Sequence, residues 1–485
     1  MDTFLSILNG IWQIIKAIFC WGLSVLIFCL SKLKNLFEKE EKPEYIIRQE
    51  LFALLDEYFG KKFPEKSNPI HSNTAINNEN DTEEELSLET DTPVSDVSTV
   101  HKNHQLPSLE LLMDYPQETP ENIVEEIESK KQIIRQTLSD FGISVTDISA
   151  TIGATVTLYE LFLARGVSAN KIKTIDEDIA RCLKVQAVRV ISPFKDRGTV
   201  ALEVPNNKSQ IVGLKSILET VEFQNCNYEL PLALGKSIDE KPQIVDLAAM
   251  PHILIGGATN NGKSVCLNAM LSSLLYTKSP EELKLVLIDP KVNEFSIYKK
   301  LGKQFNAPNI QKTVFTNDFD EIADALQSLC EEMKKRQSLF EKSNCRNIQE
   351  YNADKKVGNI AYLPRIIVVI DEFVDILGSK NKVIEDALLE LVRKSRAQGI
   401  HLVVATQRPS AKQCSSEITS QFTARIAFKV IKWQNSDIIL GDSGAEKLIG
   451  KGDMLFSNNS ELERIQGAFV STDEVRSIVE FIVKH

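Results

Sequence analysis

The chain has 485 residues, of which 43% are hydrophobic and 25% are charged, values that are ordinary for globular protein. This length exceeds that of one typical domain and predicts two or three folded units. The formal net charge of −11 excludes a chain that is basic throughout. Residues 61–120 hold twelve Asp and Glu against four Lys and no Arg, a balance of −8, so the remainder is close to neutral. Charge therefore neither favours nor excludes a nucleic-acid partner, since basic patches can form locally.

The cysteines are scattered along the chain and include no C-x-x-C pair. A disulfide framework or a zinc site needs closer, patterned spacing, so the sequence argues against both. We expect the cysteines to be reduced, as in the cytosol, and to serve as small buried hydrophobic residues. The eight positions are Cys20, Cys29, Cys182, Cys226, Cys266, Cys330, Cys345 and Cys414.

Residues 1–35 have the character of a membrane anchor. The run from Ala17 to Leu30 contains no charged residue, and Ile11–Leu30, which includes one lysine, has the length of about 20 residues that a bilayer span needs. An interfacial helix and a signal peptide are the alternatives, although no small-x-small cleavage site follows. Lys32 and Lys34 follow the apolar run, so the positive-inside bias predicts a single-pass protein of the cell membrane whose C-terminal bulk is cytoplasmic.

The next part of the chain is expected to tether the anchor to the folded units. Within residues 36–60, the apolar periodicity of Pro43–Phe59 predicts one short amphipathic helix. Residues 61–120 are rich in Ser, Thr, Asn and Glu and poor in aromatic residues, so we expect a disordered acidic linker. One island, Leu106–Leu112, is apolar enough to dock onto a folded unit.

Folded sequence resumes near Glu121. Apolar periodicity predicts a helix over residues 123–141, and strand-like runs follow, which together predict a small α+β subdomain over residues 121–245. Over residues 246–485, apolar strand runs alternate with helical segments, a pattern typical of a mainly parallel sheet covered by helices on both faces. The strands predicted in this second part are His252–Ile255, Lys284–Ile288, Ile366–Ile370, Leu402–Ala405 and Arg425–Val430.

A phosphate-binding loop follows the first of these strands. The motif G-x-x-x-x-G-K-[ST] lies between a predicted strand and a helix predicted from Val265 to Leu275, which is the context it requires. Glycines let the backbone amides face the phosphates, the lysine reaches the β- and γ-phosphates, and the serine is a Mg²⁺ ligand. The asparagine at the fourth position tolerates a positive φ better than most residues. The predicted nucleotide-binding residues are Gly257, Ala258, Thr259, Asn260, Asn261, Gly262, Lys263 and Ser264.

Two further strands end in polar groups. The run before Asp371 and Glu372 is a buried strand, and ligands of α/β sheets bind at the carboxyl ends of strands. Asp371 is expected to hold Mg²⁺ through water, and Glu372 to orient or deprotonate the attacking water. Gln407, at the tip of another strand, is expected to face the γ-phosphate; a turn held by side-chain hydrogen bonds is the alternative. A strand ending in Asp-Glu is common, so this assignment depends on the phosphate loop upstream.

Beyond these motifs, residues 137–472 resemble the FtsK/SpoIIIE family of DNA translocases. The likeness rests on several ordered segments in addition to the phosphate loop and Asp371-Glu372. They are Leu202–Asn206, Ile288–Lys291, Glu332–Arg336, Arg396–His401, Ala405–Ser410, Arg425–Phe428 and Gly444–Leu455. The island that includes Leu106–Leu109 is also similar to a short stretch of that family's linker.

The resemblance implies a RecA-like P-loop NTPase domain preceded by the α+β subdomain, assembled as a homo-hexameric ring around double-stranded DNA. It also implies that ATP binds between subunits and that a neighbour's arginine reaches the γ-phosphate. Arg396 and Arg425 are the candidates for this catalytic arginine, next to Lys263 and Glu372 as catalytic residues. Surface salt bridges are the alternative role for both arginines.

Three departures from the family pattern qualify the resemblance. Asn435-Ser436-Asp437 stands where the family usually has Asp-Ser-Arg, so a positive charge has become negative. The chain ends at His485 without the family's winged-helix reader of oriented chromosomal sequences. The membrane part is one short segment instead of several spans.

The sequence thus predicts a membrane-anchored, ATP-dependent translocase of double-stranded DNA, with ATP and Mg²⁺ as cofactors, in chromosome segregation or DNA transfer. A coupling ATPase of a mobile or conjugative element is a second hypothesis within the same class. A protein-export ATPase with a related RecA-like domain is a third, and a non-catalytic membrane scaffold is a fourth. Intact Lys263, Ser264, Asp371 and Glu372 argue against the scaffold.

Overall fold

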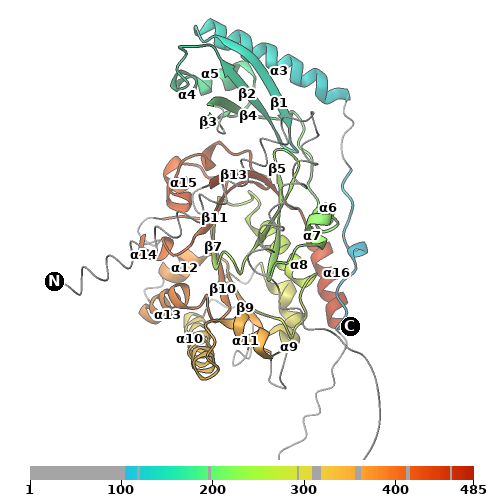
Figure 1. Cartoon of the computed structure of the whole chain (residues 1–485), viewed down its shortest axis with the longest axis vertical. Helices are drawn as coiled ribbons and strands as arrows, with labels where there is room; N and C mark the ends of the chain where they lie inside the picture. The colour runs from blue at the N-terminus through green and yellow to red at the C-terminus, as the bar shows by residue number, and fades with distance from the viewer. Residues whose placement is uncertain are drawn as a thin grey trace, which may run out of the picture. The chain divides into compact units, whose positions relative to one another are not determined.

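The structure is a computed structural model that describes residues 104–116, 121–194, 198–291, 294–307, 318–355, 362–378, 381–410, 416–458 and 461–485 (Figure 1). All of them belong to one compact unit, Ser98–His485. The predictions for residues 1–35, 36–60 and most of the acidic linker fall outside the described residues. Among the helices in the described part of the chain, none combines the length and apolar character that a bilayer crossing requires.

The first subdomain is a small antiparallel sheet with helices packed against it. In the described residues its four strands run in the order β1-β2-β4-β3, and their inner side chains form a core with α3 and α5. Tyr159, Leu161 and Val200 are fully buried there, as the strand-like runs predict. The elements are α3 (Glu121–Asp140), β1 (Val145–Ile152), β2 (Val156–Leu163), α4 (Asn170–Thr174), α5 (Asp176–Cys182), β3 (Arg189–Phe194) and β4 (Thr199–Pro205).

The second subdomain is built on a mixed sheet, which among the described residues has nine strands in the order β6-β5-β13-β12-β11-β7-β10-β9-β8. The five strands from β11 to β8 are parallel to one another, and the other four add antiparallel pairs at one side. The parallel half agrees with the prediction, whereas the antiparallel half was not predicted. The strands are β5 (Pro231–Ser237), β6 (Pro242–Asp246), β7 (His252–Gly256), β8 (Leu283–Ile288), β9 (Arg365–Ile370), β10 (Ile400–Thr406), β11 (Ala424–Phe428), β12 (Asp453–Asn458) and β13 (Glu461–Gly467).

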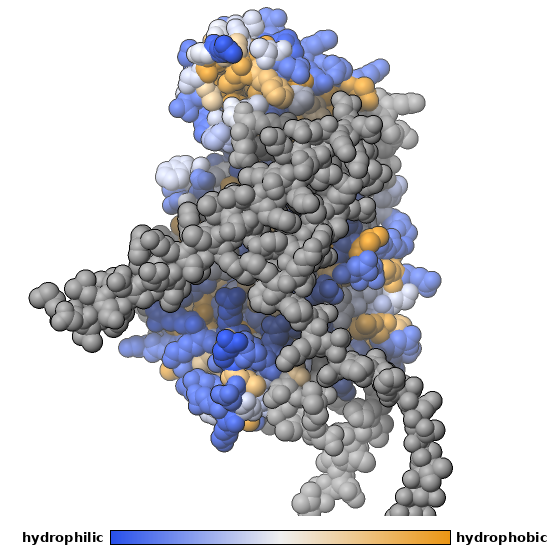
Figure 2. Space-filling view, viewed as in Figure 1, coloured by the Kyte–Doolittle hydropathy of each residue, from blue (hydrophilic) through white to orange (hydrophobic). Residues whose placement is uncertain are grey.

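Helices cover both faces of this sheet, and alternate residues of each strand supply the two cores. Ile253 and Ile255 of β7 pack on the side of α8, η3 and α16, whereas Leu254 packs on the side of α10, α12 and α13. The visible surface over α10 and α13 is mostly hydrophilic, as expected of amphipathic helices (Figure 2). The helical elements are α6 (Lys215–Leu218), α7 (Val221–Gln224), α8 (Lys263–Leu275), η3 (Ser296–Leu301), α9 (Gly302–Phe305), α10 (Phe319–Lys342), α11 (Ile348–Lys355), α12 (Phe373–Gly378), α13 (Lys382–Lys394), α14 (Ser416–Thr419), α15 (Trp433–Leu440), η4 (Ala445–Lys447) and α16 (Thr472–Lys484).

The boundary expected near residue 245 needs correction. β5 pairs with β13 and β6, so both β5 and β6 belong to the large sheet and not to the α+β subdomain. Leu232, Ala233 and Leu234 are buried in the core under α8. The four-stranded sheet ends at Pro205, and residues 206–230 connect the two sheets. An apolar strand pattern predicts which residues are extended but not which sheet they join. The boundary predicted from the sequence was therefore misplaced.

The linker was expected to be disordered as far as residue 120, but residues 104–116 lie against the large subdomain. η1 (Leu109–Leu111) is followed by Leu112, which is 3% exposed. The hydroxyl of Tyr276 donates to the Ser108 carbonyl at 3.1 Å. Glu474 accepts from the Met113 amide at 2.8 Å and from the Tyr115 hydroxyl at 3.1 Å. The apolar island therefore docks, and the segment that follows it is hydrogen-bonded to Glu474 of α16.

The described cysteines carry no disulfide, but they are not uniformly buried. Cys266 and Cys330 are buried as expected, whereas Cys226 and Cys345 are half-buried and Cys182 is exposed. The exposed side chain of Cys182 lies at the end of α5, away from the core that this helix covers. The prediction of buried cysteines was therefore wrong for Cys182.

A buried charge network joins the two sheets. The Arg464 guanidinium binds both carboxylate oxygens of Asp453, at 2.9 and 2.7 Å, and Glu203 of β4 at 2.7 Å. Arg189 of β3 reaches the same Glu203 at 3.1 Å. Burial would raise the pKa of Glu203, but the two guanidinium groups hold that pKa below its usual value. Because Asp453 also accepts from the amide of Ile449 at 2.7 Å, the network fixes the loop before β12.

Two buried histidines make the fold sensitive to acid. His252 and His401 are 1% and 0% exposed on neighbouring strands. Burial lowers the pKa of His252 to about 4 and that of His401 to about 3, with the nearby Arg365 guanidinium opposing protonation of His401. Between pH 6.5 and 5 the unfolded chain binds protons that the folded chain does not, so the free energy of unfolding falls as the pH falls, with a slope that approaches about 1.4 kcal/mol per pH unit for each histidine near pH 5.

We therefore expect urea denaturation midpoints to decline between pH 7 and pH 5. The variant His401→Gln keeps an acceptor for Arg365 and a donor for the Pro251 carbonyl but cannot titrate. Its midpoint should fall less steeply with pH. An unchanged slope would show that His401 does not carry the effect.

Candidate nucleotide-binding site

The phosphate loop lies where the sequence places it, between β7 and α8. Gly262 has φ +116°, and a Cβ there would lie 2.7 Å from the Gly452 Cα, so no other residue fits without displacing backbone. A Cβ on Gly257 would lie 2.5 Å from the Cβ of Phe428. Asn260 has φ +62°, the left-handed conformation expected for this position. The first amides of α8 therefore point at a cradle shaped by close backbone approach.

Lys263 and Asp371 meet at the floor of this cradle. The Lys263 ammonium contacts the Asp371 carboxylate, and the two side chains are 4% and 2% exposed. Burial raises the pKa of Asp371, although the Lys263 charge opposes this. Burial therefore disfavours the charged form of Asp371, and the Lys263 ammonium offsets part of this effect.

Glu372 is held as a buried carboxylate at the carboxyl end of β9. Its Oε1 accepts from the Thr406 hydroxyl at 2.9 Å and from the Gln407 amide at 3.0 Å, and its Oε2 binds Lys291 at 3.1 Å. Burial would raise the pKa of Glu372, but these hydrogen bonds and the charges of Lys263 and Lys291 hold it below its usual value. The residue also has φ +54°, a conformation that costs on the order of 1–3 kcal/mol and that clusters at functional sites.

The remaining predicted residues of the site are close by. The Thr259 hydroxyl donates to the Gln407 side chain at 3.0 Å, which joins the phosphate loop to the tip of β10. The Ser264 hydroxyl donates to Glu294 at 2.7 Å. The structure thus brings together Thr259, Lys263, Ser264, Asp371, Glu372 and Gln407.

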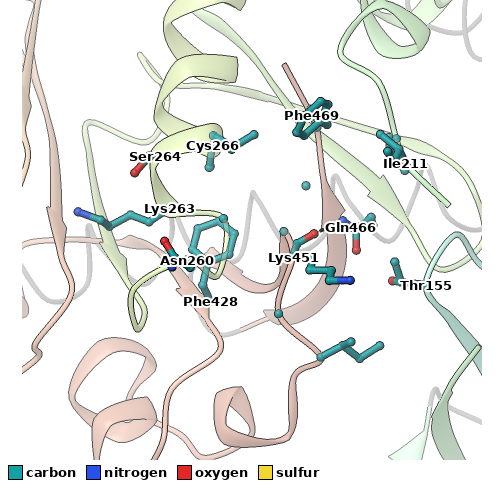
Figure 3. Close-up of a pocket in the computed structure, with 18 of the residues that line it drawn as sticks. Thr155, Ile211, Asn260, Lys263, Ser264, Cys266, Phe428, Lys451, Gln466 and Phe469 are labelled. Carbon is teal, nitrogen blue, oxygen red and sulfur yellow. Dashed lines mark hydrogen bonds between the residues drawn. The ribbon is translucent and has the colours of Figure 1, made fainter. Parts of the chain in front are cut away.

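A cavity of about 650 Å³ opens beside the phosphate loop. It is lined by the loop and the start of α8, by residues 449–452 and 466–469, and by residues 209–212 of the connector. Lys263 and Ser264 lie on one side of it, and Thr155 and Ile211 on the opposite side (Figure 3). This volume lies within the range of roughly 300–1,000 Å³ typical of ligand pockets. Asp371 does not line this cavity but contacts Lys263, which does. The phosphate cradle, Lys263 and the side-chain oxygens of Ser264 and Asp371 fit a nucleotide with Mg²⁺.

Sequence reasoning missed several residues of the site. Glu294 and Lys291 come from the loop after β8, which is folded around the Asp289 carboxylate; this acid accepts the amides of Lys291 at 3.0 Å and of Glu294 at 2.7 Å. The wall formed by Gly450–Gly452 was also missed. The motif Asp289-Pro290-Lys291 was recognised only as a family segment, and its position at the end of a parallel strand was the signal that could have placed it in the site.

The two candidate arginines differ in their surroundings, and neither lines the cavity of its own chain. The Arg425 guanidinium is half-buried and donates to the carbonyls of Phe422 at 3.0 Å, Ile439 at 3.3 Å and Thr419 at 2.9 Å. Arg396 is exposed, and within the described residues its side chain has no hydrogen bond or ion pair. Toward the described residues, therefore, Arg396 is exposed without a side-chain partner, whereas Arg425 ties three carbonyls of its own chain together.

The strand, loop and helix that hold Lys263, together with the two carboxylates at the end of β9, define a P-loop ATPase of the α/β class. The FtsK/SpoIIIE family model matches residues 213–411, and the FtsK alpha domain model matches residues 106–206. The chain therefore belongs to the FtsK/SpoIIIE family, which confirms the resemblance seen in the sequence.

Curated relatives support this assignment over most of the chain. The DNA translocase FtsK of Staphylococcus aureus (strain Mu50) is 37% identical over 428 residues, which cover 85% of this chain and 53% of the relative. The DNA translocase FtsK of Clostridium tetani is 39% identical over 409 residues, 82% of this chain and 53% of the relative. The chain thus spans about half the length of these curated relatives.

Solved structures of ATPases are also similar. The pCW3 conjugation coupling protein TcpA, in its monomer form with ATPγS, is 21% identical with a TM-score of 0.48, over 73% of this chain and 99% of that chain. The cytoplasmic domain of the type VII secretion ATPase EccC from Thermomonospora curvata is 23% identical with a TM-score of 0.49, over 57% of this chain and 35% of that chain.

Proposed function

We propose that this protein is a membrane-anchored motor that hydrolyses ATP to move along double-stranded DNA, in chromosome segregation or DNA transfer. The observation that carries the proposal is a phosphate loop with Lys263 beside two buried carboxylates, Asp371 and Glu372, in a chain of the FtsK/SpoIIIE family. The relatives from Staphylococcus aureus and Clostridium tetani are DNA translocases. The proposal includes a homo-hexameric ring around the DNA, an anchor within residues 1–35 and a cytoplasmic ATPase domain.

The residues of the site divide the work of hydrolysis. The amides of the phosphate loop and Lys263 bind the phosphates, and Gln407, whose side chain is hydrogen-bonded to Thr259 of the loop, senses the γ-phosphate. Glu372, anionic at neutral pH, accepts the proton of the water that attacks the γ-phosphorus while the bond to the ADP oxygen breaks. Ser264 and Asp371 would hold Mg²⁺, which neutralises charge on the phosphate oxygens. Lys291 occupies one Glu372 oxygen, but its side chain is 42% exposed and is also paired with Asp375, so it can leave Glu372 without losing every partner.

DNA contact in this proposal is dominated by phosphates, because a motor that slides cannot hold on to particular bases. We expect the ATPase rate of the full chain to rise on addition of linear duplex DNA of any sequence. The logarithm of DNA affinity should fall linearly with the logarithm of salt concentration, since phosphate contacts release counterions.

The two rival partners give different results in the same assay. Stimulation by an unfolded polypeptide but not by duplex DNA would replace the DNA motor with a protein-export ATPase. An ATPase rate that rises equally with duplexes of unrelated sequence, and that does not respond to polypeptide, would support the DNA motor.

A further inference from the structure

The side chain of Glu294 has no role in the function proposed above, yet it is hydrogen-bonded to Ser264, a proposed magnesium ligand. The Ser264 hydroxyl donates to the Glu294 Oε1 at 2.7 Å. Glu294 also lines the nucleotide cavity together with Lys263 and Ser264. A serine hydroxyl has one proton to donate and lone pairs that accept or ligate. With its proton directed at Glu294, the lone pairs of Ser264 are left for a cation.

The backbone of Glu294 is fixed on both sides. The carboxylate of Asp289, which is 0% exposed, accepts the amides of Glu294 at 2.7 Å and Phe295 at 3.3 Å. Downstream, Phe295 and Tyr298 are each 1% exposed, and the Tyr298 hydroxyl donates to the Asn268 side chain of α8 at 2.8 Å. The loop that holds Glu294 is therefore tied to the same helix that begins at Lys263 and Ser264.

We propose that Glu294 is a positioning residue for the Mg²⁺ site, which orients the Ser264 hydroxyl so that its oxygen faces the bound cation. Mg²⁺ demands near-ideal octahedral geometry, so a ligand free to rotate binds it less well. Partners that orient metal ligands typically contribute 10- to 100-fold to metal affinity. The negative charge of Glu294 also adds to the field that favours a cation beside Asp371, a second contribution in the same direction.

The inference rests on the proposed binding of ATP with Mg²⁺. A binding assay distinguishes failure of that proposed function from failure of the role assigned to Glu294. Fluorescent ADP is bound to the full chain, and Mg²⁺ is then titrated from an EDTA-buffered start. Wild-type protein should bind ADP more tightly as Mg²⁺ rises. If the wild type does not bind ADP, the proposed function fails before Glu294 is tested.

Two substitutions at Glu294 separate orientation from charge. Glu294→Ala removes the acceptor and should lower the apparent Mg²⁺ affinity by about 10- to 100-fold, while ADP binding in EDTA is not weakened. Glu294→Gln keeps an acceptor oxygen and should lose less. Glu350→Gln, a surface carboxylate paired with Arg346 outside the cavity, is the matched control and should behave like wild type.

A double-mutant cycle identifies the route of the effect. In a Ser264→Ala background, Glu294→Ala should cause a smaller loss than in the wild-type background, because the hydroxyl that it positions is absent and only the effect of its charge remains. A loss of equal size in both backgrounds, or a loss below about twofold in the wild-type background, would overturn the proposal. Thermal melting of each variant shows whether it is folded. If Glu294→Ala does not fold, the Mg²⁺ titration of Glu294→Gln tests the proposal in its place.

Discussion

Replacing Glu372 by glutamine should lower ATP turnover by about 10²- to 10⁴-fold while ATP binding is retained. The amide keeps the size of the side chain and can still accept from Thr406 and the Gln407 amide, which hold the carboxylate at 2.9 and 3.0 Å. It cannot accept the proton of the attacking water. Turnover is measured in steady state, and binding is measured by equilibrium titration with fluorescent ATP.

The control for this experiment is Lys263→Ala, which should fail at the earlier step. Loss of the ammonium removes the main cationic partner of the phosphates and also leaves Asp371 without its cation, so nucleotide binding should be lost. Wild-type turnover by Glu372→Gln would show that another group is the base. Loss of ATP binding by Glu372→Gln would show that the carboxylate serves the structure of the site.

The second large effect is expected at Arg396, in a site shared between subunits. An arginine that completes a neighbour's site contributes about 10³- to 10⁵-fold to turnover in characterised phosphoryl-transfer enzymes. We expect Arg396→Ala to lose activity of this order with its melting temperature unchanged, because its exposed side chain has no partner within the described residues.

Arg425→Ala is the matched comparison. It removes the guanidinium donor from three backbone carbonyls, those of Phe422, Ile439 and Thr419, of which Thr419 keeps the Phe422 amide as a donor. Its main effect should therefore be a lower melting temperature, by the equivalent of about 1–3 kcal/mol.

Mixing inactive variants tests whether Arg396 acts in trans. Subunits carrying Glu372→Gln supply an intact arginine, and subunits carrying Arg396→Ala supply an intact base, so their mixture should regain part of the activity that each lacks alone. Restoration with Arg425→Ala in place of Arg396→Ala would assign the trans role to Arg425. Normal hydrolysis by Arg396→Ala and by Arg425→Ala alone would exclude both arginines.

The parts of the site predicted from sequence are those that a short motif determines. The phosphate loop needs its glycines, lysine and serine within eight consecutive residues, and a strand must precede it, so both its place and the positive φ of Asn260 could be predicted. Asp371 and Glu372 were predicted because the carboxyl ends of parallel strands meet at one edge of a sheet.

The parts that could not be predicted depend on contacts between distant segments. The hydrogen bond from Ser264 to Glu294 joins residues 30 positions apart, and Glu474 binds Tyr115 across 359 positions. β5 carries the same apolar pattern whether it pairs within the first sheet or with β13, so its sheet was assigned wrongly. The buried ion pair of Glu203 and Arg464 could not be predicted either, because nothing in the sequence around one residue indicates its partner on the other sheet.

The central claim is that hydrolysis at this site drives movement along duplex DNA, and displacement of a triplex-forming oligonucleotide tests it most directly. The full chain is mixed with linear duplex DNA that carries a labelled third strand, and release of that strand is followed after ATP is added. The account predicts release with ATP by the wild type, and none with a non-hydrolysable analogue or with Glu372→Gln. Vigorous hydrolysis in the presence of DNA without release of the third strand, or equal release by Glu372→Gln, would contradict it.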